Sequence, residues 1–150
     1  MIKIIKAKKS NKDLNVLIKE LDRYLKKTDG EDHDFYNQFN RLDYIHHLVV
    51  AYNDKSAIGC GAFRKIDDKT VEIKRMYVKK EFRRKGVAKT ILVFLENWAQ
   101  QENFTTCVLE TGDRQQEAIQ LYKKAGYQKI PNYGQYAQME NSNCFEKHLV

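Results

Sequence analysis

A basic segment with one glycine, in the middle of the chain, contains residue types suited to binding phosphate. It reads V-E-I-K-R-M-Y-V-K-K-E-F-R-R-K-G-V-A-K-T, from Val71 to Thr90, and predicts a strand followed directly by a helix. Backbone N–H groups at a helix start have no intrahelical partner, and Gly86 has no Cβ to block an approaching anion. The adjacent basic side chains are Arg83, Arg84 and Lys85. The segment therefore predicts an anion-binding turn; the alternative is an exposed cationic surface.

The elements that must position this turn follow from the spacing of apolar residues. Apolar runs bounded by turn residues predict strands at residues 2–7, 48–52, 57–64, 70–78, 105–110, 127–130 and 144–149. Helical spacing predicts helices at residues 14–25, 35–42, 85–99 and 118–125. The expected order is β-α-α-β-β-β-α-β-α-β-β, an α/β (α+β) fold with a mixed sheet. Because no linker or repeat divides the chain, residues 1–150 are expected to form one domain.

Two motifs, together with this order of elements, resemble the GNAT superfamily of acyl-CoA-dependent N-acetyltransferases. One is R-x-x-G-x-A at residues 83–88, and the other is A-I-Q-L-Y-K-K-A-G-Y at residues 118–127, which matches the family pattern A-x-x-L-Y-x-x-x-G-[FY]. The resemblance covers nearly the whole length. It implies a GNAT-like, mostly antiparallel central sheet flanked by helices. It also implies transfer of an acetyl group from acetyl-CoA to a primary amine of a small molecule, peptide or protein, by direct attack in a ternary complex.

The resemblance implies a set of residues that bind coenzyme A. Main-chain N–H groups of the turn would hold its pyrophosphate, at Arg83, Arg84, Lys85, Gly86, Val87 and Ala88, and Lys89 would continue this site. The pantetheine arm would pair with the backbone of Met76, Tyr77 and Val78 like an added strand. Gln115 stands where the family frequently has Asn, and its amide can also donate and accept hydrogen bonds.

The resemblance also implies candidates for proton transfer. An amine with a pKa near 10.4 must lose a proton before it attacks a thioester. Two candidate bases are Glu72, expected on the same strand face as Lys74 and Met76, and Glu110 at a strand end. A water chain is the third option, and either glutamate could instead have only a structural or substrate-binding role. Tyr122 matches the family's general acid, which would donate a proton or hydrogen bond to the departing thiolate.

The residues expected near the amine acceptor lie in two loops. Tyr133 and Tyr136 belong to a long aromatic-bearing loop before the last strand, and such loops more often serve a site than a core. Tyr36, with the acidic residues of segment 31–34, would form the opposite wall of an acceptor groove in this fold. The acidic side chains are expected to attract a cationic amine.

Composition limits the class of protein and its compartment. Of the 150 residues, 42% are hydrophobic and 31% charged, which is too apolar for a disordered chain. No apolar run approaches the ~18 residues of a membrane-spanning helix, and the start does not resemble a signal peptide. We therefore expect a cytoplasmic protein without a membrane partner.

Cysteines and histidines indicate neither a disulfide framework nor a metal site. Cys60, Cys107 and Cys144 are far apart and lie in apolar segments, so we expect buried free thiols. His46 and His47 are adjacent at the start of a strand and would point to opposite faces, which is poor geometry for binding one ion. We expect no metal cofactor.

Two alternatives to an acetyltransferase stay open, and the net charge of +7, from 27 basic and 20 acidic residues, bears on the first. A basic nucleic-acid-binding module would use the charge and the aromatic side chains, but no recognisable binding motif supports a nucleic-acid partner. A GNAT-like domain that binds acyl-CoA without catalysing transfer would act as a sensor. The family resemblance is also compatible with a homodimer.

Overall fold

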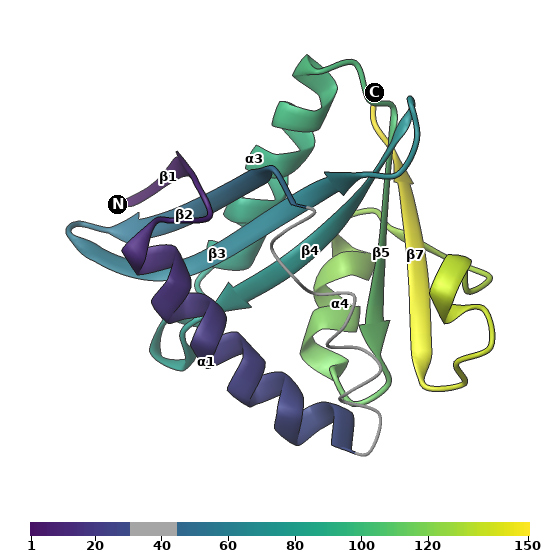
Figure 1. The fold of residues 1–150 in the computed structure, drawn as a ribbon, viewed down its shortest axis with the longest axis horizontal. Coiled ribbons are helices and arrows are strands. Elements are labelled where there is room, and N and C mark those ends of the chain that lie inside the picture. Colours follow the sequence, from purple (N-terminus) through teal and green to yellow (C-terminus); the bar gives the residue numbers. More distant parts are fainter. Residues whose placement is uncertain (31–44) are drawn as a thin grey trace.

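The computed structural model describes residues 1–30 and 45–150, which form a twisted seven-stranded sheet with helices on both faces (Figure 1). The strands are β1 (Ile2–Ala7), β2 (His47–Asn53), β3 (Ser56–Lys65), β4 (Thr70–Val78), β5 (Thr106–Gly112), β6 (Gln128–Ile130) and β7 (Ser142–His148). Their order across the sheet is β1-β2-β3-β4-β5-β7-β6. Only β4 and β5 pair in parallel, so the predicted mixed, mostly antiparallel sheet is confirmed.

Among the described residues, three helices connect and cover the strands: α1 (Lys12–Asp29), α3 (Val87–Gln101) and α4 (Gln116–Lys124). The side chain of Asn11 caps α1 by accepting a hydrogen bond from the Leu14 N–H at 2.9 Å. Two short 3₁₀ turns follow β4 and β6: η3 (Lys80–Phe82) and η4 (Gly134–Tyr136). The helix predicted at 35–42 lies outside the described residues. Within the described part of the chain, no helix is both long and apolar enough to cross a membrane.

The two faces of the sheet bury separate apolar clusters. Helix α3 packs Ile91 and Leu95 against a cluster that includes Phe63 of β3. Helix α1 packs Leu14 and Leu17 against the opposite face. The three cysteines are buried free thiols, as predicted. The sheet is therefore held between α1 and α3, and residues of the central strands have fixed orientations.

Strands β4 and β5 separate after a short paired stretch. Their parallel register runs only from Thr70↔Thr106 to Glu72↔Val108, although both strands continue beyond it. The two arrows diverge visibly in Figure 1, where α4 lies beside the opening. Backbone groups of the second half of β4 are therefore not paired with β5, which is the arrangement needed for an extended ligand to add to that edge.

A β-bulge at Arg75 changes which side chains share a face of β4. Arg75 has φ +58°, and the register with β3 shifts at this point. Met76 therefore packs with the cluster beneath α3, whereas Tyr77 packs with the cluster beneath α1. The prediction that Glu72, Lys74 and Met76 lie on one face is wrong for Met76, because an extra residue reverses the alternation.

Candidate active site

A cavity of about 530 Å³ opens where β4 and β5 diverge. Its walls come from the end of β4, the turn before α3 and the first turns of α4. Among its lining residues are predicted cofactor contacts: Met76, Tyr77, Val78, Arg83, Arg84, Gly86, Val87, Ala88, Lys89 and Gln115. Lys85 was also predicted to contact the cofactor, but it does not line this cavity. Its ammonium instead lies 5.7 Å from the centre of the Phe82 ring. The cavity also contacts Tyr24 and Glu117, which sequence reasoning missed because neither belongs to a motif.

The turn before α3 has the geometry of an anion site. Gly86 is the N-cap of α3 with φ +82°, and a Cβ added there would meet nothing within 4 Å. The Thr90 N–H donates to the Gly86 carbonyl at 3.0 Å, the first i→i−4 bond of the helix. The N–H groups of Val87, Ala88 and Lys89 precede that bond and stand beside open space. Backbone donors of this kind, at the positive end of a helix dipole, fit a phosphate group.

The two arginines of the turn have different surroundings. The Nε of Arg83 donates to the Val78 carbonyl at 2.8 Å, and its guanidinium lies 5.4 Å from the centre of the Tyr24 ring. Arg84 is exposed and lies 3.3 Å from the carboxylate of Glu117. Arg83 therefore fixes the turn against β4 and α1, whereas Arg84 lies at the mouth of the cavity, where screening weakens its ion pair.

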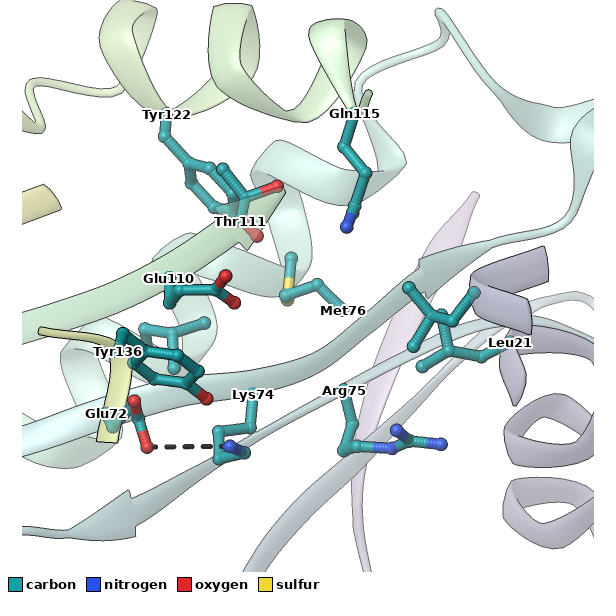
Figure 2. A pocket seen from close by; sticks show the side chains of 12 residues that line it. Leu21, Glu72, Lys74, Arg75, Met76, Glu110, Thr111, Gln115, Tyr122 and Tyr136 are labelled. Carbon is teal, nitrogen blue, oxygen red and sulfur yellow. Dashed lines mark ion pairs between the residues drawn. The ribbon is translucent and has the colours of Figure 1, made fainter. Parts of the chain in front are cut away.

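A smaller cavity of about 80 Å³ adjoins the first and shares Leu21, Met76, Gln115 and Tyr122 with it. Charged side chains from the diverging strands also line it: Glu72, Lys74, Arg75 and Glu110. Figure 2 shows Glu110 lying between Tyr122 of α4 and Lys74 of β4 in this view. The smaller cavity thus gathers both predicted bases and the predicted acid, and Tyr122 also lines the larger cavity.

Glu72 is held by three neighbours and is almost inaccessible. Its residue is 1% exposed, and one carboxylate oxygen accepts a hydrogen bond from Arg64 Nε at 2.7 Å and lies 3.6 Å from Lys74 Nζ. The other oxygen accepts a hydrogen bond from the hydroxyl of Tyr133. Glu72 thus lies beside a lysine and is buried, because α1 and the loop before β7 cover this face.

Glu110 keeps an unsatisfied carboxylate oxygen. Its Oε2 is buried and has no hydrogen-bond partner among the described residues. Burial raises the pKa of Glu110 to about 7, although a hydrogen bond from Ser142 and the charge of Lys74 act in the opposite direction. Such a carboxyl exchanges its proton near neutral pH, which is the range that a general base needs.

Tyr122 lines both cavities from α4. It is 6% exposed, and its ring packs edge-on against Tyr127 with centroids 5.7 Å apart. Burial, and then the nearby charge of Glu110, raise the pKa of Tyr122 well above its ordinary value. Its hydroxyl therefore keeps its proton at neutral pH and is able to donate a hydrogen bond.

The predicted acceptor residues separate into three cases. Tyr136, in η4, is 2% exposed and lines the smaller cavity. Tyr133 packs edge-on against Tyr136, and its hydroxyl is engaged by Glu72, so it supports the wall of the cavity. Tyr36 and the acidic segment 31–34 lie outside the described residues.

Sequence reasoning missed the two consecutive cations of the smaller cavity. Lys74 is 7% and Arg75 is 5% exposed, and both project from the α1-facing side of β4. Burial lowers the pKa of Lys74, partly offset by the charge of Glu72. The sequence did contain a signal for them, namely charged residues inside a predicted central strand. Because Lys and Arg are rarely buried without a partner, such residues indicate a candidate site.

Comparison with known proteins assigns the chain and its fold to a class. The model of the acetyltransferase (GNAT) family matches residues 14–127, and the chain belongs to this family. A Klebsiella pneumoniae structure described as an acyl-CoA N-acyltransferase superposes with a TM-score of 0.84 at 26% identity, over 100% of this chain and 99% of the other. The predicted family and fold are therefore confirmed.

Individual relatives differ in length and in how much of them this chain covers. The chain is 32% identical over 143 residues to an IAA acetyltransferase of Azospirillum brasilense, covering 89% of this chain and 88% of that protein. It is 39% identical over 80 residues to "Probable N-acetyltransferase 14" of Xenopus tropicalis, covering 53% of this chain but 39% of that protein. A PaiA N-acetyltransferase from Thermoplasma acidophilum, solved in complex with coenzyme A, has a TM-score of 0.73 at 22% identity over 99% of each chain.

Proposed function

We propose that residues 1–150 form one acetyltransferase domain that moves the acetyl group of acetyl-CoA to a primary amine by direct attack in a ternary complex. The observation that carries this proposal is that Tyr122 lines both adjoining cavities, while Glu110 lines the smaller one beside it. One cavity ends at backbone donors suited to a diphosphate, and the other contains an unsatisfied carboxylate. Each co-substrate thus has a separate approach to one point.

The larger cavity supports acetyl-CoA as the co-substrate. The N–H groups at the start of α3 would bind the pyrophosphate, and the unpaired edge of β4 at residues 76–78 would bind the pantetheine arm. Gly86 favours this fit because its position leaves space within 4 Å. Lys89 and Arg84 would add charge that complements the phosphates.

Proton transfers at the junction would involve two of this chain's side chains. Glu110 would take the proton of the acceptor's ammonium, so that the neutral amine attacks the thioester carbonyl. As the C–S bond breaks, Tyr122 would hydrogen-bond the leaving thiolate or give it a proton. Glu72 is less suited to the first step, because hydrogen bonds from Arg64 and Tyr133 engage both of its oxygens.

The proposal is tested by measuring coenzyme A release from acetyl-CoA with a panel of amines. Tyr122→Phe is expected to lower kcat by about 10² or more, with acetyl-CoA affinity nearly unchanged, because it removes a donor needed in the transition state. Tyr127→Phe is a matched control, since that hydroxyl donates to Glu96 at 2.8 Å, away from either cavity. The control is expected to lower stability while kcat is retained.

Two results would contradict this function. Equal kcat for Tyr122→Phe and the wild type would show that the Tyr122 hydroxyl takes no part in the chemical step. Tight acetyl-CoA binding without turnover of any amine would favour a non-catalytic acyl-CoA sensor instead.

A further inference from the structure

The charged groups in and around the smaller cavity are unevenly paired with one another. Arg64 and Lys74 both approach Glu72, at 2.7 Å and 3.6 Å, and the Nη2 of Arg75 lies 2.5 Å from Asp22. Asp22 is partly solvent-accessible, with a side chain 44% exposed, so water weakens its effect on the buried cation. Three cations thus face two carboxylates before Glu110 is considered.

Two side-chain nitrogen atoms of Arg75 donate no hydrogen bond to the described residues. Its side chain is 2% exposed, and its Nε and Nη1 are buried with no hydrogen-bond partner in the described part of the chain. Buried guanidinium donors are unfavourable unless they are paired, and a carboxylate is their best-matched partner. The unpaired donors therefore indicate an anionic group that arrives with a ligand.

A distortion of the backbone at Arg75 places the Arg75 side chain in this cavity. The bulge, with φ +58° at a non-glycine residue, adds Arg75 to the α1-facing side that Lys74 already occupies. Figure 2 shows both side chains leaving β4 on the same side, with Met76 on the other. Two cations are thereby lined up along one wall.

Glu110 supplies the complementary feature in the same cavity. Among the described residues, its buried Oε2 has no hydrogen-bond donor, whereas Nε and Nη1 of Arg75 have no acceptor. An amine satisfies the first and a carboxylate satisfies the second. A ligand carrying both groups would complete the pairing of this cavity.

We infer that the acceptor is an amino acid or another amine bearing a carboxylate, whose carboxylate is bound by Arg75 with the support of Lys74. This inference rests on the proposed function, since it names the substrate class for the same site. Arg75 would act in binding and specificity, and Glu110 would receive the proton of the amine.

The test compares acceptors that differ only in the carboxylate. Amino acids that differ in spacer length or in side chain, such as glycine, β-alanine and phenylalanine, are compared with their carboxamides and decarboxylated amines by coenzyme A release. The wild type is expected to prefer the acids by ~10-fold or more in kcat/KM, as one charge-assisted hydrogen bond requires. Equal or better turnover of the amides and simple amines would overturn the inference.

Variants locate the preference in Arg75. Arg75→Gln is expected to abolish the preference for the acids while acetyl-CoA affinity is retained, and Arg75→Lys to restore part of it. Arg23→Gln makes the same change at an exposed position of α1 and is expected to keep the full preference. A preference that survives in a folded Arg75→Gln, as judged by acetyl-CoA binding, would refute the role of Arg75.

A binding measurement separates this inference from the proposed function. Calorimetric titration of the coenzyme A complex with phenylalanine and with phenylalaninamide needs no turnover. Tighter binding of the acid without any acetylation would contradict the proposed catalytic function but support the carboxylate site. Acetylation of amines combined with no preference for the acid would support the proposed catalytic function but contradict the carboxylate site.

Discussion

Glu72 and Glu110 line one cavity from neighbouring strands, yet their environments differ. Glu72 is ion-paired with Arg64 and hydrogen-bonded by Tyr133, so its charge is compensated. Glu110 is desolvated, with one oxygen left without a hydrogen-bond partner among the described residues, and its pKa is raised to about 7. Such a difference between adjacent carboxyl groups favours distinct roles, with Glu110 as the base and Glu72 as part of the framework.

Glu110→Gln tests this assignment through the pH dependence of catalysis. The wild-type kcat, at saturating acceptor, is expected to rise with pH through about 7 as Glu110 ionises. The variant is expected to lose ~10²-fold or more in kcat and to lack that rise, because glutamine cannot accept the proton. Glu102→Gln, at the far end of α3, changes the net charge equally and is expected to keep the wild-type profile. A rise near pH 7 that persists in Glu110→Gln would assign the base elsewhere.

The same pKa has a consequence for stability. Because the native pKa of about 7 exceeds the ordinary value of 4.5, the folded state holds the proton more tightly and stability decreases as pH rises between these values. Glu110→Gln is therefore expected to gain stability relative to the wild type as pH rises from 4.5 to 8, by up to about 3 kcal/mol. Urea unfolding at both pH values measures the gain. A difference independent of pH would show that Glu110 is not desolvated in the native state.

At the scale of elements, the site depends on two departures from regular structure. The divergence of β4 from β5 opens the larger cavity, and the bulge at Arg75 reassigns side chains to faces of β4. The start of α3 adds the backbone donors that close the cavity at one end. Each feature changes which backbone groups or side chains face the cavities. The site is therefore formed where strands and helices end or depart from regular geometry.

Gly86→Ala tests the start of α3, with Gly134→Ala as its matched control. Both glycines have positive φ, +82° and +51°, and at both an added Cβ meets nothing within 4 Å. Each substitution is expected to cost about 1 kcal/mol of stability in urea unfolding, from backbone strain alone. Only changes at Gly86 are expected to weaken acetyl-CoA binding, and Gly86→Glu by at least ~10-fold, because its carboxylate repels the diphosphate. Calorimetry that finds unchanged affinity for Gly86→Glu would exclude this turn as the phosphate site.

At the scale of the whole molecule, the charge of +7 is expected to assist the binding of an anionic co-substrate. Acetyl-CoA at ~100 times its Kd should stabilise the native state by about 2.7 kcal/mol, or about 5–10 °C in Tm. The gain should decrease at higher salt, because screening weakens contacts with exposed lysines and arginines. Duplex DNA at the same charge concentration is expected to leave Tm unchanged. Thermal shifts that respond to DNA and not to acetyl-CoA would favour the nucleic-acid-binding alternative.

Much of the fold was predictable because its signals are local. The range of β4 was predicted as residues 70–78 and is Thr70–Val78. Asn11, a residue type that favours helix N-caps, caps α1, and Gly126, with φ +96°, follows α4. Caps, turns and hydrophobic periods act over a few residues, so sequence spacing is sufficient to identify them.

The candidate site was only partly predictable. The motifs identified Gly86 and Tyr122, and both line the larger cavity. The bulge at Arg75 was not anticipated, because an alternating pattern does not reveal an inserted residue. The buried cations Lys74 and Arg75 were therefore overlooked.

The sequence by itself determined the family, the element order and the position of the turn proposed to bind phosphate, since each depends on residues close together along the chain. Only the tertiary structure decided which carboxylate is unsatisfied. Glu72 finds its partners 8 residues away at Arg64 and 61 residues away at Tyr133. Proton affinity follows from burial and from such distant contacts, and neither is fixed until the chain has folded.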